Sequence, residues 1–205
     1  MTLVAIIDYG LCNMDSVARA VKKCGGSAVI TKEAKEIDAA THLILPGVGA
    51  FPDAMRNMRA TSLDVVLRRR VLEEHVPFLG ICLGMQLMAT TGYEGEETQG
   101  LGFIDGEVTL LQPQAGERIP HIGWNQAVLT REHPLLKDVP SSSDFYFVHS
   151  YRLRPTREED VLATTPYGGG FPSIVGHGTI VGTQFHPEKS QKPGFQLLRN
   201  FLSFR

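Results

Sequence analysis

PFLGICLGMQLMAT, residues 77–90, joins a short apolar run to a turn and then to a helix-forming run. The apolar part is typical of a buried strand, and Gly80 and Gly84 flank Cys82 in the pattern G-x-C-x-G. A nucleophile on a sharp strand-to-helix turn has a strained backbone, so the positions around it must be very small. The stretch therefore predicts a nucleophile elbow with Cys82 at the tip of a sheet.

The position expected for Cys82 also favours reactivity of its sulfur. A cysteine at a helix N-terminus experiences the positive end of the helix dipole, which favours thiolate over thiol. The backbone N–H of Leu83, directly after the nucleophile, could donate to an oxyanion. The alternative interpretation is a buried cysteine on a tight turn, and the motif alone does not decide between the two.

The segments before this stretch alternate short apolar runs with amphipathic patterns. Strands are expected at 2–8, 27–31, 42–47 and 77–81, with helices at 16–24 and 63–75. This alternation predicts an α/β fold with a mostly parallel central sheet flanked by helices. The second half predicts additional, partly antiparallel strands and a last helix at 193–204. GYEGEETQG, residues 92–100, is expected to form a polar surface loop.

Length and composition limit the possible functions. The 205 residues, 42% of them hydrophobic, predict a single domain spanning 1–205. A net charge of -2 gives no general attraction to nucleic acid or anionic membranes. No apolar run approaches the roughly 20 residues that cross a bilayer, and no basic signal region opens the chain. We therefore expect a cytoplasmic protein that binds neither nucleic acid nor membrane.

The cysteines and histidines argue against disulfides and metal. Three cysteines are an odd number, so at least one thiol is expected to be free, and Cys12 and Cys24 are interpreted as small, partly buried hydrophobic residues. Six histidines show no spacing that gathers ligands, so no catalytic metal or other cofactor is expected. They are His42, His75, His121, His133, His149 and His177.

The run GTQFHPEKS, residues 182–190, supplies a candidate base for Cys82. In a strand, residues two apart point the same way, so His186 and Glu188 can lie side by side. The histidine could take the cysteine proton and return it to the leaving group, while the carboxylate orients the ring. A solvated pair at a strand end is the alternative, and the elbow favours the catalytic set Cys82, His186 and Glu188.

The run ILPGVGAF, residues 44–51, is a second candidate source of oxyanion donors. Gly47, Val48 and Gly49 follow an expected strand, and their bare backbone could approach a substrate closely. A glycine pair in such a position often only makes a turn. The location of this loop, after the strand that precedes the elbow strand, favours the oxyanion interpretation.

Together, the elbow, PGVG and FHPE resemble the class I, triad-type glutamine amidotransferases, from the first expected strand to the last helix. Four further stretches are similar to the glutaminase subunits of imidazole glycerol phosphate synthases, which act in histidine biosynthesis. They are IIDYGLCNMDSV, LILPGVGAFPDAM, PHIGWN at 120–125 and FYFVHSY at 145–151. The resemblance implies a flavodoxin-like class I glutamine amidotransferase fold.

The resemblance also implies a reaction and a partner. Cys82 would attack the side-chain amide of glutamine, forming a γ-glutamyl thioester and releasing ammonia, and water guided by His186 would release glutamate. The ammonia would pass to a (β/α)8-barrel cyclase subunit, which makes imidazole glycerol phosphate and aminoimidazole carboxamide ribotide (AICAR). Because this chain has no such barrel, the cyclase is expected to be a separate polypeptide in a heterodimer.

By position in the family motifs, further residues receive expected roles. The substrate glutamine would be held by Gly49, Gln86, Glu94, Ser150 and Tyr151. The partner interface or ammonia exit would include Asn13, Trp124, Tyr146 and Lys189. Without the family context, the single tryptophan would be placed in the core. Cys12 departs from the family pattern, which has glycine at this position.

The resemblance leaves three functional hypotheses. In the leading one, glutaminase activity stays low until the cyclase is bound and loaded with its ligand, because in the family PGVG must reorient before its N–H can serve the oxyanion. The second is a stand-alone cysteine hydrolase of γ-glutamyl or peptide bonds. The third is a catalytically inert regulatory module of the same fold, against which the intact set of Cys82, His186 and Glu188 counts.

Overall fold

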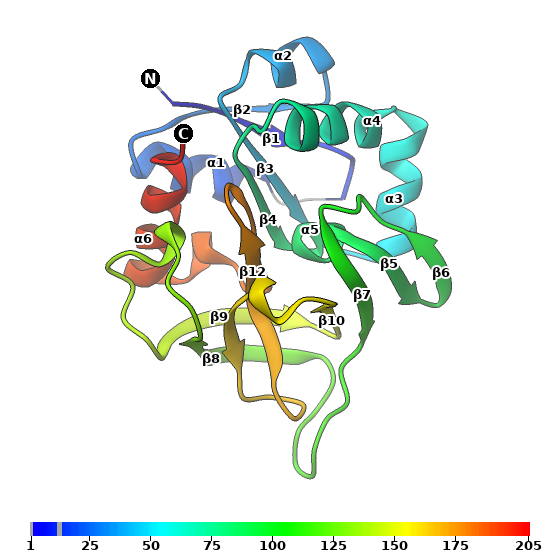
Figure 1. The fold of residues 1–205 in the computed structure, drawn as a ribbon, viewed down its shortest axis with the longest axis vertical. Helices are drawn as coiled ribbons and strands as arrows, with labels where there is room; N and C mark the ends of the chain where they lie inside the picture. The colour runs from blue at the N-terminus through cyan, green and yellow to red at the C-terminus, as the bar shows by residue number, and fades with distance from the viewer. Residues whose placement is uncertain (1, 12–13) are drawn as a thin grey trace.

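The computed structural model describes residues 2–11 and 14–205. Its first half alternates strands and helices, as the sequence predicts (Figure 1). The elements are β1 (Leu3–Ile7), α1 (Met14–Lys23), β2 (Ser27–Thr31), α2 (Ala34–Ala39), β3 (His42–Gly47), α3 (Phe51–Ala60), α4 (Leu63–Arg68), β4 (Phe78–Cys82) and α5 (Leu83–Gln86). A π-helical segment, Arg69–Glu73, continues α4.

One long sheet joins this half to the second half of the chain. Among the described residues it has nine strands in the order β2-β1-β3-β4-β13-β12-β11-β8-β9. Pairs from β2 to β13 are parallel, and pairs from β13 to β9 are antiparallel. The predicted α/β fold with added antiparallel strands is confirmed. The later strands are β8 (His121–Leu129), β9 (Ser143–His149), β11 (Val161–Thr165), β12 (Phe171–His177) and β13 (Ile180–Thr183).

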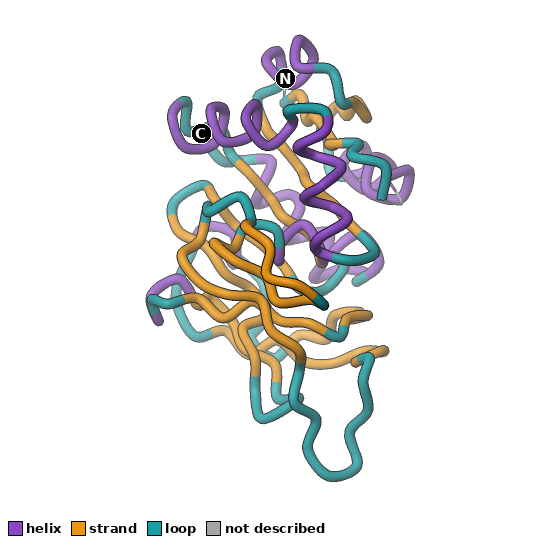
Figure 2. The backbone as a smooth tube through the Cα atoms, turned by 90° about the vertical axis from the view of Figure 1, so that its right-hand side faces the viewer, coloured by secondary structure: helices purple, strands orange, loops and turns teal. Residues whose placement is uncertain are grey.

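Two helical layers bury the parallel part of this sheet. In β1, Val4 and Ile6 join a core cluster with α1 and α6 (Gln191–Leu202), whereas Ala5 and Ile7 join a cluster with α3 and α4. All four side chains are fully buried. Figure 2 shows the helices gathered around this part, while the antiparallel part consists mainly of strands and loops. Burial on both faces explains why β1, β3 and β4 are mostly apolar, whereas β2, at the edge of the sheet, is partly exposed.

A second sheet has the order β10-β7-β5-β6. Its strands are β5 (Ala89–Glu94), β6 (Glu96–Gln99), β7 (Ile104–Leu110) and β10 (Tyr151–Pro155). The predicted surface loop at 92–100 is therefore wrong, because β5 and β6 form a hairpin that turns at Gly95 with φ +77°. The segment is polar because much of the hairpin is exposed.

The turn between β4 and α5 is as sharp as the sequence predicts. Cys82 has φ +54° and ψ -111°, a strained conformation for a residue with a side chain. A Cβ on Gly84 would lie 1.7 Å from the backbone oxygen of Leu45, and a Cβ on Gly80 would lie 2.6 Å from that of Gly84. The helix after the turn is shorter than expected, because the chain enters β5 at Ala89.

No helix in the described part of the chain is both long and apolar enough to span a membrane.

The contact between Gly84 and Leu45 gives a test of the turn. Gly84→Ala should lower the free energy of unfolding by about 1–3 kcal/mol or more, because the added carbon collides with backbone. Gly116→Ala is the control: its φ of +89° disfavours alanine, but open space surrounds it. Urea unfolding should show the larger loss for Gly84→Ala, and equal losses would contradict this account of the turn.

Candidate active site

Cys82 lies at the carboxyl end of β4, between the neighbouring strands β3 and β13. In open α/β sheets, this edge is where ligands bind. The side chain of Cys82 is buried, and its Sγ lies 3.7 Å from the backbone oxygen of Val148. The Nε2 of Gln184 lies 3.9 Å from the same sulfur. The cysteine is thus held at a sheet edge with polar groups around it.

His186 and Glu188 form a buried pair. Nδ1 of the histidine lies 2.9 Å from Oε1 of the glutamate, and their side chains are only 6% and 3% exposed. The strand geometry expected for them is wrong, because β13 ends at Thr183 and Glu188 belongs to the 3-10 helix Pro187–Lys189. The two side chains meet because the extended chain turns into this helix directly after His186.

Backbone contacts with β9 fix the position of His186. Its N–H donates to the backbone oxygen of Tyr146 at 3.0 Å. Ser190 completes the attachment: its hydroxyl donates to the oxygen of His186 at 2.6 Å and accepts from the N–H of Tyr146 at 3.0 Å. The imidazole is therefore positioned by two elements, β9 and the turn after β13.

The electrostatics of His186 favour the imidazolium form. Burial alone would lower its pKa, but hydrogen bonding with Cys82 and Glu188, together with their charges, raises the pKa to about 9. Because Glu188 engages Nδ1, Nε2 is the nitrogen available to the sulfur, and among the described residues it makes no hydrogen bond of ordinary length. A thiolate beside an imidazolium can attack a carbonyl carbon and then protonate a leaving amine.

A cavity of about 280 Å³ opens beside Cys82 and Leu83. Every residue expected to hold the substrate lines it, namely Gly49, Gln86, Glu94, Ser150 and Tyr151. Val48 also lines it, as do Pro120, Val148 and His149, to which the sequence analysis assigned no role. The signal for these three was present, because they lie in or beside the PHIGWN and FVHSY stretches.

Two of these residues are already partly engaged by the protein. Oε2 of Glu94 accepts the N–H of Phe51, at the start of α3, at 2.8 Å. Nε2 of Gln86 donates to the backbone oxygen of Tyr151 at 2.9 Å and to Oε1 of Gln184 at 3.1 Å. Since both amide hydrogens are used, Gln86 can offer a ligand only its carbonyl oxygen.

The candidate oxyanion donors differ in availability. Leu83 is the first residue of α5, so its N–H has no partner within the helix. The N–H of Val48 instead donates to the backbone oxygen of Leu11 at 2.9 Å. Gly49 has φ +101°, which only glycine adopts easily, and a Cβ on Gly47 would lie 2.0 Å from the hydroxyl oxygen of Tyr9. The loop therefore borders the cavity through Val48 and Gly49, but the N–H of Val48 is occupied by the backbone oxygen of Leu11.

The residues expected at the partner interface gather on one surface. Trp124 is 50% exposed on β8, which makes the core alternative wrong. Its ring lies 6.1 Å from that of Tyr146 on β9, and Nζ of Lys189 lies 5.8 Å from the centre of the Tyr146 ring. Asn13 and Cys12 lie outside the described residues.

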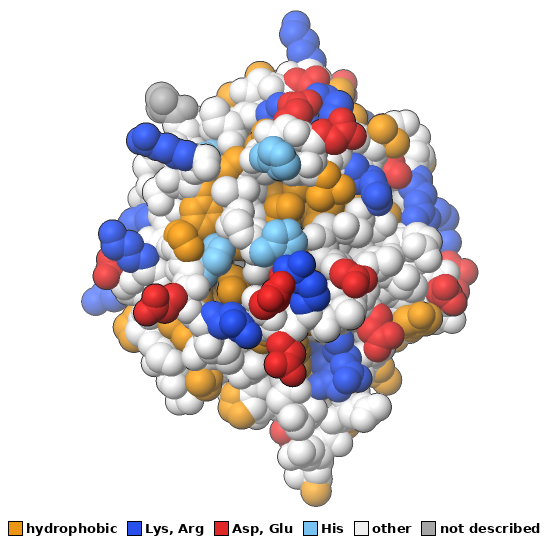
Figure 3. Space-filling model, in the orientation of Figure 1, with side chains coloured by type: hydrophobic (Ala, Val, Ile, Leu, Met, Phe, Trp, Pro, Cys, Tyr) orange, Lys and Arg blue, Asp and Glu red, His pale blue; other side chains and the backbone are white. Residues whose placement is uncertain are grey.

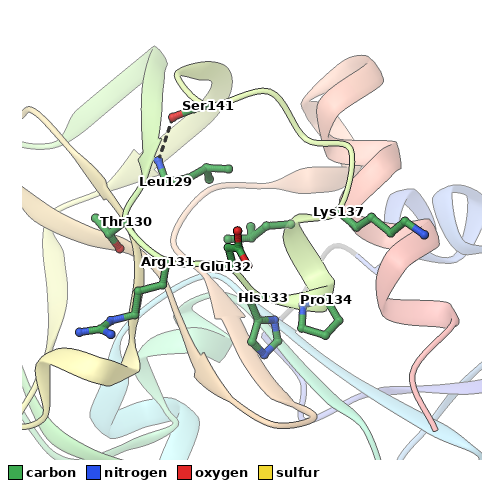
Figure 4. Close-up of a pocket in the computed structure, with 9 residues that line it drawn as sticks. Leu129, Thr130, Arg131, Glu132, His133, Pro134, Lys137 and Ser141 are labelled. Atoms are coloured by element: carbon green, nitrogen blue, oxygen red, sulfur yellow. Dashed lines mark hydrogen bonds between the residues drawn. The ribbon is translucent and has the colours of Figure 1, made fainter.

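A larger cavity, of about 690 Å³, contains none of the expected site residues (Figure 4). It lies around the segment from Leu129 to Lys137 and Ser141.

Within the described ranges, no group of three or more His, Cys, Asp or Glu side chains is arranged to hold a metal ion. Figure 3 shows charges of both signs scattered over one face without a continuous basic area.

His121 and His149 form a buried pair at the wall of the 280 Å³ cavity, which His149 lines. Nδ1 of His149 lies 2.8 Å from the backbone oxygen of Tyr151, and its Nε2 lies 3.0 Å from Nδ1 of His121. The amide of Asn125 lies 3.2 Å from Nε2 of His121. Burial lowers the pKa of His149 to about 3 and that of His121 to about 4. Both rings are therefore neutral near pH 7.

This pair predicts a loss of stability in acid. Below their ordinary pKa of 6.5, both histidines bind protons in the unfolded chain but not in the folded one, so the free energy of unfolding should fall as the pH drops from about 6.5 to about 4. Urea unfolding between pH 7 and about 4.5 measures this loss. In His149→Gln the fall should be smaller, and an unchanged slope would contradict the assignment.

The comparisons with known proteins agree over nearly the whole chain. The family model of class-I glutamine amidotransferases matches residues 5–203. The imidazole glycerol phosphate synthase subunit HisH 2 of Nitrobacter winogradskyi is 48% identical over 210 residues, which cover 100% of this chain and 99% of the relative. The HisH subunit of Moorella thermoacetica is 47% identical, with 98% and 94% covered, and that of Aquifex aeolicus is 46% identical, with 96% and 94% covered.

Solved structures share the fold at low sequence identity. A crystal structure of a glutamine amidotransferase has a TM-score of 0.75 at 21% identity, covering 96% of this chain and 98% of that one. A structure of PurLQS from Thermotoga maritima has a TM-score of 0.74 at 17% identity, covering 98% and 97%. With the family match and the close relatives, the chain belongs to the class-I glutamine amidotransferase family and, within it, to the family of HisH subunits.

Proposed function

We propose that this chain is the glutaminase subunit of an imidazole glycerol phosphate synthase, with residues 1–205 as one amidotransferase domain. The names of its relatives support the complex. The observation that carries the chemistry is the buried His186–Glu188 pair next to Cys82, at a cavity lined by Gln86 and Glu94. The proposed biosynthetic role assigns the protein to the cytoplasm.

In the proposed mechanism, the Cys82 thiolate attacks the side-chain amide carbon of glutamine. The charge that develops on the amide oxygen is stabilised by the N–H of Leu83. His186, held as imidazolium by Glu188, gives its proton to the leaving nitrogen, so that ammonia departs and a γ-glutamyl thioester remains. The neutral histidine then takes a proton from water, whose oxygen attacks the thioester and releases glutamate and the thiolate.

The loop at Val48 supports a dependence on the partner. With its N–H bound to the oxygen of Leu11, this peptide cannot donate to an oxyanion at Cys82. A second donor would appear only if the peptide reoriented. We propose that binding of the cyclase stabilises the reoriented loop, so that glutamine is hydrolysed rapidly only when the ammonia has a destination.

The proposed partner is a (β/α)8-barrel cyclase, and β8 and β9 supply the surface for it. Ile122 and Trp124 are exposed large apolar residues of β8, Tyr146 lies beside Trp124, and Lys189 lies beside Tyr146. Exposed aromatic residues are common at the centre of protein interfaces. Because Tyr146 also binds the backbone of His186, this surface is connected directly to the catalytic histidine.

A stand-alone hydrolase of γ-glutamyl or peptide bonds is the competing function. The cavity of about 280 Å³ suits a single amino acid better than a peptide. Full activity of the isolated chain on glutamine, or activity on peptides, would support this alternative. A catalytically inert module would give no covalent adduct on Cys82 with a glutamine-mimicking diazoketone.

Cys82→Ala tests the division of labour between the two subunits. In the complex, glutamine-dependent synthesis should fall at least about a thousandfold, because the nucleophile is lost. Synthesis from added ammonium salt should be unchanged, because it needs only the cyclase. Both rates can be followed as release of AICAR, and loss of both would contradict the proposal.

Trp124→Ala tests the interface. Removing a central aromatic residue should raise the Kd for the cyclase about tenfold or more, as measured by titration calorimetry. Tyr93→Ala is the control, because Tyr93 is similarly exposed, at 46%, but lies on β5. An unchanged Kd for Trp124→Ala, or an equal effect of both variants, would move the interface elsewhere.

A further inference from the structure

Gln184 is a fully buried polar residue beside the proposed nucleophile, and it has no part in the mechanism proposed above. It lies two residues before His186 in the segment that follows β13. Phe185, between them, stacks on Phe145 at 3.9 Å between ring centres. Both Gln184 and His186 interact with the Cys82 side chain, so they approach the sulfur from one side of this segment.

The hydrogen bonds around Gln184 fix the orientation of its amide. The backbone oxygen of Tyr151 can only accept, so Gln86 must point its NH2 group toward it. The same NH2 group then faces Oε1 of Gln184 at 3.1 Å. This contact leaves Nε2 of Gln184 facing Sγ of Cys82. The reversed orientation would place two NH2 groups against each other, so the network determines which end of the amide meets the sulfur.

The buried histidines hold the other side of this network. The oxygen of Tyr151 also accepts from Nδ1 of His149, so Nε2 of the neutral ring accepts from Nδ1 of His121. The NH2 group of Asn125 donates to the remaining nitrogen of His121. The backbone oxygen of Tyr151 thus accepts from both Gln86 and His149. This fixed acceptor positions the amide of Gln86, which in turn positions that of Gln184.

The two hydrogen-bonding neighbours of the sulfur differ in character, because one is an acceptor and the other a donor. The backbone oxygen of Val148, 3.7 Å away, can accept from a thiol but repels a thiolate. The NH2 group of Gln184 does the opposite, because it donates to a thiolate. A donor at this place offsets the unfavourable carbonyl and leaves the nitrogen of His186 free for proton transfer.

We propose that Gln184 is a further residue of the catalytic site, whose amide donates to the Cys82 thiolate and keeps it available for attack. Gln86 positions this amide by engaging its oxygen. The inference rests on the proposed role of Cys82 as nucleophile and adds a source of its reactivity that is independent of His186. It concerns the free chain as well as the complex.

Alkylation of Cys82 by iodoacetamide near neutral pH tests this role without glutamine or the cyclase. Peptide mass spectrometry gives the rate at Cys82, and half-buried Cys24, whose pKa is raised by burial, serves as an internal reference. Gln184→Met removes the donor at similar volume and should slow alkylation of Cys82 about fivefold, the size expected for one hydrogen bond. Gln184→Glu keeps the shape but replaces the donor with an acidic group, and it should react more slowly still.

The ranking of the variants distinguishes hydrogen bonding from packing. If Gln184 only filled space, the isosteric Gln184→Glu would react most like the wild type. Gln86→Met should slow alkylation less than Gln184→Met, and the double variant should add little to Gln184→Met, because the two amides act in sequence. Asn200→Asp is the control: it alters another buried amide, which binds the backbone oxygens of Leu135 and Lys137, and should leave Cys82 unaffected.

Two results would overturn the inference. One is an equal alkylation rate in the wild type and Gln184→Met, with both folded by circular dichroism. The other is a wild-type Cys82 that reacts no faster than Cys24. Neither result would decide the glutaminase proposal, which depends on glutamine-dependent synthesis by Cys82→Ala in the complex.

Discussion

The contact between Gly84 and the backbone of Leu45 is the constraint on which the site depends. Because no side chain separates them, α5 packs directly against β3, and the chain passes from strand β4 into helix α5 at a single residue. That residue is Cys82, whose strained conformation persists because buried strands on both sides hold it. The same contact brings the first N–H of α5 and the loop after β3 to one cavity, so the proposed nucleophile and the candidate oxyanion donors depend on one packing contact.

The antiparallel half of the sheet supplies the remaining chemistry. The backbone of Tyr146 fixes His186, and the segment from Val148 to Tyr151 lines the cavity. Ile122 and Trp124, exposed apolar residues of β8, lie on the strand that pairs directly with β9. A partner bound there would lie beside Tyr146, whose backbone oxygen binds the N–H of the proposed base His186, so the proposed binding surface and the proposed catalytic site are separated by a single residue.

Sequence patterns were sufficient for the parallel half and for the turn at Cys82, because apolar runs and glycine spacing are local properties. They failed where tertiary contacts decide. The hairpin around Gly95 looked like a loop because its exposed strands are polar, and His186 and Glu188 meet through a helical turn rather than along a strand. The pairing of His121 with His149 depends on the register between the neighbouring strands β8 and β9, which the spacing of the two histidines in the sequence does not reveal.

The central claim is that Cys82 acts as a nucleophile whose full reactivity toward glutamine requires the partner. Labelling with a glutamine-mimicking diazoketone, followed by peptide mass spectrometry, measures this directly. The account predicts one adduct per chain, on Cys82, formed much faster when the cyclase and its ligand are present. An adduct on another residue, or equally fast labelling of Cys82 in the isolated chain, would contradict it.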